Sequence, residues 1–234
     1  MAARDPLLLI PGLLCDEALW AHQTEFLSDV ADISIADMTR DDSIAAMASR
    51  SLAHAPKRFA LAGLSMGGYV ALEIMRRAPD RVTRLALLDT SARADTPEQT
   101  ARRRDLIELA EKGRFKGVTP RLLPSLIHPD RQGEQALTDA VMGMAERVGQ
   151  AAFLRQQNAI MGRPEGRPDL PAIAVPAMVL CGRQDALTPL AVHEEMAAAI
   201  PGARMCLVEE CGHLSPLERP HAVTALMRDW LLRG

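Results

Sequence analysis

The stretch Gly63-Leu64-Ser65-Met66-Gly67 constrains this 234-residue chain more than any other. It is a G-x-S-x-G sequence that follows an apolar run, residues 59–62, and begins a helical pattern. Strand, sharp turn and helix together predict a nucleophile elbow, in which a strained turn exposes the Ser65 hydroxyl above a sheet. A Cβ atom at Gly63 or Gly67 is expected to strike the neighbouring strand or helix, and Gly68 is expected to allow close packing. The alternative is an ordinary glycine-rich turn.

A serine hydroxyl is a weak nucleophile at neutral pH, so this hypothesis requires a base and an acid that orients the base. Candidates for both follow predicted strands later in the chain. Asp185 comes after the apolar run 177–181, and His213 lies in the loop after a short strand at 204–208. Open parallel sheets carry their sites at the carboxyl ends of the strands, where both residues are expected. The predicted catalytic residues are therefore Ser65, Asp185 and His213.

The order serine, acid, histidine is that of the alpha/beta-hydrolases, and the chain resembles this family over nearly its whole length. Residues 182–189 (G-R-x-D-x-L-T-P) and 212–220 (G-H-x-x-x-x-E-x-P) resemble the acid and base loops of the family. Residues 8–16 resemble its first strand and oxyanion loop. The resemblance is weakest between about residues 93 and 170, where the family inserts a variable cap.

The oxyanion hole is a second expectation from this resemblance. It implies that the backbone N–H groups of Leu13 and Met66 bind the oxyanion. Many members have His-Gly in this loop, whereas this chain has Pro11-Gly12. Because the donors are backbone groups, this departure leaves the hole in place and alters only the support around Leu13.

The alternation of apolar and helical patterns predicts an α/β fold with a doubly wound, mostly parallel sheet of about six strands. Residues 1–92 and 169–234 are expected to form the hydrolase core, and residues 93–168 a helical cap insertion. The expected strands are 7–10, 33–36, 58–62, 84–89, 177–181 and 204–208, and the expected core helices are 17–28, 43–53, 66–78, 190–199 and 219–232.

Composition supports this interpretation and argues against several others. A chain of this length with 48% hydrophobic residues can bury one sizeable core. The net charge of −3, without a long run of one sign, argues against a nucleic-acid partner and gives no electrostatic reason for membrane binding. No segment has the roughly 20 apolar residues needed to cross a bilayer. The apolar residues 6–15 are interrupted by Pro11-Gly12, so they are expected to form a core strand rather than a signal sequence.

The cysteines and histidines suggest no metal or cofactor. The cysteines have no disulfide-like or C-x-x-C spacing, which favours reduced thiols in a cytoplasmic protein; they are Cys15, Cys181, Cys206 and Cys211. No His, Cys and acid cluster has metal-ligand spacing. Most other histidines are expected at the surface, namely His22, His54, His193 and His221. His128 lies in the cap and could face the pocket.

Several residues keep an alternative role. Asp89 ends a predicted strand at which some relatives of the family place the orienting acid, although holding the turn at residues 90–91 is the favoured role. Arg102-Arg103-Arg104 is expected on a solvated helix face, or else as an anchor for an acidic carrier. Met142, Met144 and Met161 are expected to fill the core, or else to line an adaptable acyl pocket.

These features predict a serine hydrolase that cleaves a small to medium carboxylic ester or related acyl compound through an acyl-enzyme, without a cofactor. The chain has only four phenylalanines, two tryptophans and one tyrosine, so aliphatic and methionine side chains should form the walls of its pocket. The same triad also serves C–C bond hydrolases, lyases and cofactor-free peroxidases. A carrier-linked thioesterase and a slow-turnover ligand receptor are further alternatives. The sequence predicts no oligomeric state.

Overall fold

A single parallel sheet of six strands organises the computed structural model, which describes residues 4–120 and 122–233. The strands are β1 (Asp5–Ile10), β2 (Ala31–Ile35), β3 (Phe59–Leu64), β4 (Val82–Leu88), β5 (Ala177–Gly182) and β6 (Arg204–Val208). They are arranged in the order β2-β1-β3-β4-β5-β6. Every residue of β3 and β5 is buried, as expected for a parallel sheet that is covered on both faces. The predicted doubly wound sheet of about six strands is confirmed.

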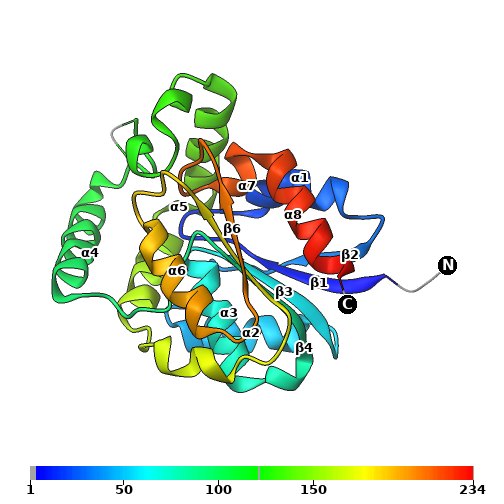
Figure 1. Ribbon diagram of the computed structural model, residues 1–234. Helices are drawn as coiled ribbons and strands as arrows, with labels where there is room; N and C mark the ends of the chain where they lie inside the picture. Colours follow the sequence, from blue (N-terminus) through cyan, green and yellow to red (C-terminus); the bar gives the residue numbers. More distant parts are fainter. Residues whose placement is uncertain (1–3, 121, 234) are drawn as a thin grey trace.

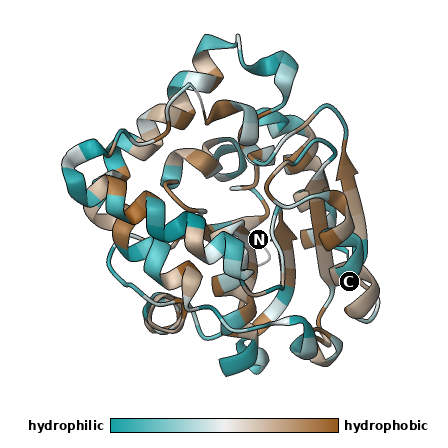
Figure 2. Cartoon of the chain, turned by 90° about the vertical axis from the view of Figure 1, so that its left-hand side faces the viewer, coloured by the Kyte–Doolittle hydropathy of each residue, from teal (hydrophilic) through white to brown (hydrophobic). Residues whose placement is uncertain are grey.

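Helices cover both faces of the sheet (Figure 1). On one face, the sheet packs against α2 (Ile44–His54), α3 (Met66–Arg77) and α6 (Leu190–Ala199). On the other face, it packs against α8 (Pro220–Leu232) and the segment around Leu19 and Trp20, and α1 (Ala21–Phe26) lies against α8. Alternate residues of β1 point into the two cores, with Leu8 in the first and Leu7 in the second. Figure 2 shows the hydrophobic strands enclosed by helices that have hydrophilic outer surfaces.

Two predicted helices are each divided in the structure. The segment expected to form one helix at 17–28 is a 3-10 turn (Glu17–Trp20) followed by α1, because the backbone of the fully buried Trp20 is not α-helical (φ −104°, ψ 10°). The segment expected at 219–232 begins with a short α7 (Ser215–Glu218), and α8 follows from Pro220. The break falls at Arg219 because a residue that precedes proline is disfavoured in helical backbone. Another 3-10 turn, Pro79–Arg81, joins α3 to β4.

A helical segment separates β4 from β5 in the region predicted to be a cap. It contains α4 (Pro97–Leu109), a π-helical turn (Ala110–Arg114), 3-10 turns at Leu123–Ser125, Pro129–Arg131 and Arg167–Ala172, and the long α5 (Gln135–Met161). Helix α5 is kinked at Gly149, whose φ is 74°. Figure 1 shows α4 at the outer edge of the molecule. The cap boundaries at residues 93 and 168 stay a prediction.

A buried ion-pair cluster joins the two ends of this segment. Asp95 follows the start of the segment, and its side chain is 1% exposed. Its carboxylate oxygens lie 2.7 Å from Nε of Arg103 and 2.6 Å from a terminal nitrogen of Arg163. The prediction of a solvated face at 102–104 is therefore wrong for Arg103, which turns inward and also donates to Gln157. A charge can be buried in this way because it is paired and hydrogen-bonded.

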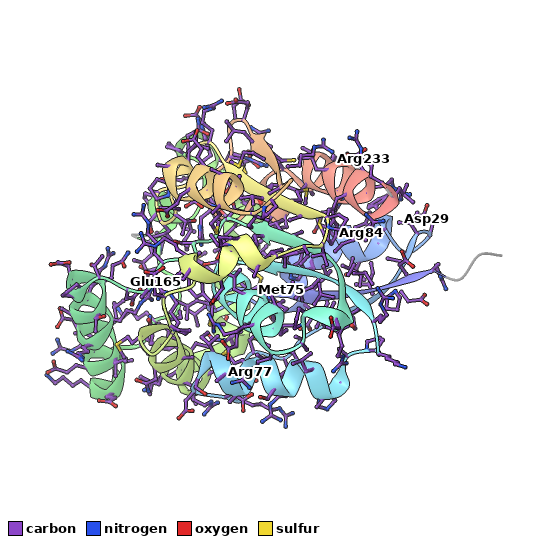
Figure 3. All side chains as sticks on the ribbon, turned by 60° about the horizontal axis from the view of Figure 1, so that its bottom comes forward. Asp29, Met75, Arg77, Arg84, Glu165 and Arg233 are labelled. Carbon is purple, nitrogen blue, oxygen red and sulfur yellow. The ribbon has the colours of Figure 1, made fainter. Side chains whose placement is uncertain are left out.

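The amino ends of the strands lie at the edge of the sheet opposite the carboxyl ends. Arg84, at the start of β4, donates hydrogen bonds to the backbone carbonyls of Trp230 and Arg233. Figure 3 shows Arg84 and Arg233 close together there, and Glu165 on the other side. A hollow of about 210 Å³ lies beside Arg84, at the edge of the sheet away from the carboxyl ends of the strands. No helix in the described part of the chain is long and apolar enough to cross a membrane.

Candidate active site

The turn between β3 and α3 holds Ser65 in a strained conformation. The backbone of Ser65 has φ 54° and ψ −116°, a combination that costs a non-glycine residue about 1–3 kcal/mol. Hydrogen bonds on both sides hold the turn. The Ser65 N–H donates to the Leu88 carbonyl (3.0 Å), and the Ser65 carbonyl accepts from the Gly68 N–H (2.9 Å) and the Thr90 hydroxyl (2.7 Å). The Ser65 side chain is partly exposed at the carboxyl edge of the sheet.

The glycines around Ser65 permit a close approach between α3 and the strands. A Cβ atom on Gly63 would overlap the Gly67 carbonyl, and a Cβ atom on Gly67 would overlap the Ile10 carbonyl of β1. A Cβ atom on Gly68 would overlap the Thr90 side chain. These overlaps confirm the steric reason that the sequence suggests for each glycine.

The three predicted catalytic side chains come together in one hydrogen-bonded chain. The distance from His213 Nε2 to Ser65 Oγ is 2.8 Å. The distance from His213 Nδ1 to Asp185 Oδ2 is also 2.8 Å. His213 and Asp185 are buried, whereas Ser65 is partly exposed. The geometry allows the imidazole to accept a proton from Ser65 while Asp185 holds its other nitrogen.

The loop after β5 surrounds the Asp185 carboxylate with donors. Oδ1 accepts from the N–H groups of Leu187 and Thr188, each at 2.9 Å, and Oδ2 accepts from the Thr188 hydroxyl at 2.7 Å. Burial opposes the charged form of Asp185, but the positive charge of protonated His213 and these hydrogen bonds outweigh burial and lower the pKa of Asp185. Asp185 therefore stays ionised at neutral pH, which keeps the His213 proton on Nδ1.

The pKa of His213 is shifted in the opposite direction. Burial disfavours the imidazolium, but the Asp185 carboxylate and its hydrogen bond stabilise it more and raise the pKa of His213. The neutral imidazole, with Nε2 free to accept a proton, therefore becomes the main form only at a higher pH than for an ordinary histidine.

The loop that carries His213 is attached to the insertion. The His213 N–H donates to the Leu126 carbonyl at 3.0 Å. The buried carboxylate of Glu218 accepts from the N–H groups of Gly212 (2.9 Å), Leu214 (3.3 Å) and His128 (2.7 Å). Glu218 belongs to the G-H-x-x-x-x-E-x-P segment, and this motif is the feature of the sequence that could have identified its role.

The His128 ring is hydrogen-bonded to the N–H of Asp130, so it caps the 129–131 turn.

Asp89, the alternative acid, is fully buried beside this chain of residues. Its carboxylate accepts from the N–H groups of Gly182 (2.9 Å) and Ser215 (3.3 Å), which ties β4 to β5 and to α7. Burial, followed by repulsion from Asp185, raises the pKa of Asp89 to about 8. The hydrogen-bond partners of His213 Nδ1 in the described structure are the side chains of Asp185 and, at 3.4 Å, Thr188. The geometry thus supports Asp185 for the orienting role and Asp89 for a structural one.

His193 differs from its prediction, because it is completely buried rather than at the surface. Its Nε2 accepts the Thr90 N–H at 2.9 Å, and its Nδ1 lies 3.4 Å from the Pro189 carbonyl. Burial lowers the pKa of His193 to about 4, so the ring is neutral at neutral pH. It links the acid loop to the turn after β4. Its spacing from Met196 and Ile200, which are also buried, was the signal for burial.

The two predicted oxyanion donors, Leu13 and Met66, come from different loops near Ser65. Met66 is the first residue of α3, and N–H groups in the first turn of a helix have no acceptor within the helix. Leu13 lies in the turn after β1, close to Ser65, since a Cβ atom on Gly12 would be 3.3 Å from Ser65 Cβ. Within residues 4–120 and 122–233, no protein group accepts the N–H of Leu13 or Met66. Neither N–H is therefore already bonded to another described residue, as the predicted oxyanion role requires.

Apolar side chains of the insertion pack beside this oxyanion loop. Leu14 forms a buried cluster with Ala110, Ala145 and Phe153. Partly buried side chains extend the cluster; they are Leu13, Leu106, Phe115, Val118, Val148 and Leu154. The side chains that pack against the predicted oxyanion loop are therefore mainly aliphatic. Met144 lies in the core on one face of the sheet, as expected for a residue that fills the core.

One buried cysteine, Cys181, belongs to a group of side chains that could hold a metal ion. Ligand atoms of Cys181, Asp185 and His193 lie within 4.8 Å of one another. However, Asp185 is already bonded to His213 and Thr188, and His193 Nε2 accepts the Thr90 N–H. Burial raises the pKa of the Cys181 thiol well above its usual range, which disfavours the thiolate that binds metals. This arrangement fits the orienting role of Asp185 better than a metal site.

Comparison with known proteins agrees with the geometry. Residues 8–226 match the model of the alpha/beta hydrolase family. The chain is 29% identical over 206 residues to a pimeloyl-[acyl-carrier protein] methyl ester esterase of Neisseria meningitidis serogroup B, which covers 85% of this chain and 79% of that protein.

Two solved structures have the same fold. A thermophilic esterase from Thermogutta terrifontis superposes with a TM-score of 0.87 at 29% identity, over 97% of this chain and 89% of the other. An enol-lactonase from Burkholderia xenovorans LB400 superposes with a TM-score of 0.89 at 25% identity, over 99% and 93%.

The raised pKa of His213 predicts the pH dependence of turnover. Only the neutral imidazole can accept the Ser65 proton, so kcat/KM should fall as the pH drops through the pKa of His213. Because this pKa is raised, the midpoint of the acid limb should lie above the usual value of about 6.5. Initial rates between pH 5 and 9 with a non-ionising ester at constant ionic strength measure this midpoint. A midpoint at or below 6.5 would mean that burial outweighs Asp185.

Replacing each of the two carboxylates by an amide, in separate variants, distinguishes their roles. Asp185→Asn removes the group that orients His213, so kcat should fall by about 10⁴-fold. Asp89→Asn should leave most of kcat unchanged. It should lower the free energy of unfolding by about 1–3 kcal/mol, because the backbone N–H groups that donate hydrogen bonds to Asp89 are buried. Steady-state kinetics and urea denaturation of both variants test this ranking. The reverse ranking of kcat, in two folded proteins, would transfer the orienting role to Asp89.

Proposed function

Because the chain belongs to the alpha/beta hydrolase family, we propose that it is a serine hydrolase that cleaves a small to medium carboxylic ester through an acyl-enzyme. The observation that carries this proposal is the hydrogen-bonded chain from Ser65 through His213 to Asp185, with a partly exposed serine at one end. The two N–H groups beside Ser65 provide the oxyanion hole that acyl transfer requires.

The reaction follows from the positions of these groups. Ser65 Oγ attacks the carbonyl carbon, and His213 Nε2 takes the hydroxyl proton. The Leu13 and Met66 N–H groups stabilise the negative oxygen of the tetrahedral intermediate. The alcohol then leaves with the proton from His213, and an acyl-enzyme remains. Water attacks the acyl-enzyme and gives a proton to His213, and collapse of the second intermediate releases the acid and returns a proton to Ser65.

Two kinds of evidence support an ester with an aliphatic acyl group. The relatives include a methyl ester esterase, a thermophilic esterase and an enol-lactonase, all of which are named for cleaving ester bonds. The side chains beside the oxyanion loop are apolar, and they are mostly aliphatic apart from Phe115 and Phe153. Such walls select an acyl group by its volume and apolar contact.

An acyl group carried on an acidic protein is a second candidate substrate. One relative is named for an ester on an acyl-carrier protein. Arg102 and Arg104 are exposed on α4, and neither forms an ion pair with another described residue. These two cations could attract an acidic carrier to the insertion. In that case, a carrier-linked ester should be cleaved faster than the same ester in free form, and the advantage should shrink with added salt.

A covalent probe tests the nucleophile. If Ser65 is acylated during turnover, a fluorophosphonate should add a single probe group to the tryptic peptide that contains Ser65, because it traps an activated serine. Ser65→Ala should abolish both the labelling and the ester hydrolysis, which mass spectrometry and a p-nitrophenyl acetate assay measure. Ser43→Ala, a change at the cap of α2, serves as the control and should keep both.

Labelling that persists in Ser65→Ala would contradict the assignment. A wild-type ester hydrolysis rate no greater than that of Ser65→Ala would instead favour a C–C bond hydrolase, a lyase, a peroxidase or a receptor on the same fold.

The length of the acyl chain tests the apolar pocket. Each buried methylene contributes about 0.8 kcal/mol, so kcat/KM should rise over the first few carbons of a p-nitrophenyl ester series and fall once the pocket is full. Rates from acetate to dodecanoate give this profile. A flat profile would mean that the insertion does not set substrate specificity.

A further inference from the structure

Gln156 is a fully buried polar side chain near the carboxyl end of α5, a helix of the insertion. Its side-chain oxygen accepts the Leu14 N–H at 3.0 Å, and its side-chain nitrogen donates to the Met38 carbonyl at 3.0 Å. Both bonds are buried. The side chain therefore joins the loop after β1 to the loop after β2, although it belongs to neither.

The turn that Gln156 holds is the one that contains the predicted oxyanion donor. Leu14 has a φ of 58°, a left-handed conformation that a leucine adopts only when its surroundings enforce it. The Leu14 N–H belongs to the peptide group that directly follows Leu13. Because this N–H points to Gln156, the orientation of that peptide is fixed. The next bond, from the Cys15 N–H to the Gly12 carbonyl at 3.2 Å, closes the turn.

Other contacts of α5 support the same two loops. Arg147 Nε lies 2.6 Å from Asp16 Oδ2, just beyond the turn, and Arg155 Nε donates to the Thr39 carbonyl at 2.8 Å. Phe153 packs against Leu14 in the apolar cluster. Of these groups, Gln156 is the one that bonds directly to the turn. The others hold α5 against the core.

We propose that Gln156 is a positioning residue for the oxyanion hole, which means that the insertion completes the catalytic site and does more than cover it. The inference rests on the proposed function, since an oxyanion hole matters only for acyl transfer. In many members of the family, a histidine precedes the glycine of this loop, and here Pro11 offers no polar side chain. The amide of Gln156 provides a polar contact for this turn through the Leu14 N–H.

Without Gln156, the Leu14 N–H and the Met38 carbonyl would both lose buried partners. The turn would relax from its left-handed conformation, and the Leu13 N–H would move with it. Loss of an oxyanion donor costs about 10²–10³-fold in kcat. Because a misdirected donor still contributes, the expected loss is about 10–100-fold, with little change in KM.

The test compares Gln156→Met with Gln157→Met. Methionine has a similar volume and no amide, so the first change removes both hydrogen bonds with little change in packing. Gln157 is the next residue of α5 and equally buried, but it bonds to Arg103 instead of the oxyanion turn. We expect kcat for p-nitrophenyl butyrate to fall 10–100-fold in Gln156→Met and to stay within about threefold in Gln157→Met.

A boronic acid provides a readout that a general loss of stability would not move. Its adduct with Ser65 is a negatively charged tetrahedral boronate, one of whose hydroxyl groups is expected to occupy the oxyanion hole. The affinity of butylboronic acid should fall by about the same factor as kcat in Gln156→Met, and it should be unchanged in Gln157→Met. A folded Gln156→Met variant with wild-type kcat and boronate affinity overturns the inference. Ester hydrolysis and Ser65 labelling by wild type would show that the proposed function still stands.

Hydrogen exchange tests the inference without a variant, should Gln156→Met fail to fold. In the free wild-type protein, the Leu14 amide is expected to exchange at least tenfold more slowly than amides of exposed turns. In the boronate adduct, its exchange should be slower still. Exchange of Leu14 at the rate of an exposed loop, in free enzyme and adduct alike, would overturn the proposal.

Discussion

The close packing of the first turn of α3 against β1 and β3 is the constraint on which the site depends. Gly63 and Gly67 have no side chain because backbone carbonyls occupy the space that a Cβ atom would need. Ser65, between these two glycines, has a positive φ, and its hydroxyl lies 2.8 Å from His213 Nε2. The close packing brings the loop after β1 next to Ser65. The position of Ser65, the proposed nucleophile, relative to the predicted oxyanion loop is therefore a consequence of backbone packing.

The other proposed catalytic groups, Asp185 and His213, lie on longer loops, and buried polar residues hold each loop in place. Glu218 accepts hydrogen bonds from three backbone N–H groups around the His213 loop. Asp89 accepts one from the end of β5 and one from the start of α7. His193 connects the acid loop to the turn after β4. Buried polar groups of this kind are costly unless they are satisfied, so each of them fixes one arrangement of the loop that it serves.

The insertion contributes to this order as well as to the apolar surroundings of the site. Its residue Leu126 accepts the His213 N–H, and Gln156 accepts the Leu14 N–H. Two of the loops around Ser65 thus take part of their support from a segment outside the sheet. For the proposed reaction, we therefore expect a change in the insertion to alter the rate of the chemical step as well as the choice of substrate.

The sequence by itself determined the sheet, the elbow and the candidate catalytic residues. Strand and helix periodicity, glycine sterics and the G-x-S-x-G, acid-loop and base-loop motifs are local signals, and short segments of chain carry them completely. The pairing of Gln156 with Leu14, the burial of His193 and the inward turn of Arg103 involve residues far apart in the chain. A glutamine, histidine or arginine on a helix has the same local preferences whether it faces solvent or a partner. Only the tertiary structure decided these roles, because they depend on which backbone groups the fold leaves buried and in need of a partner.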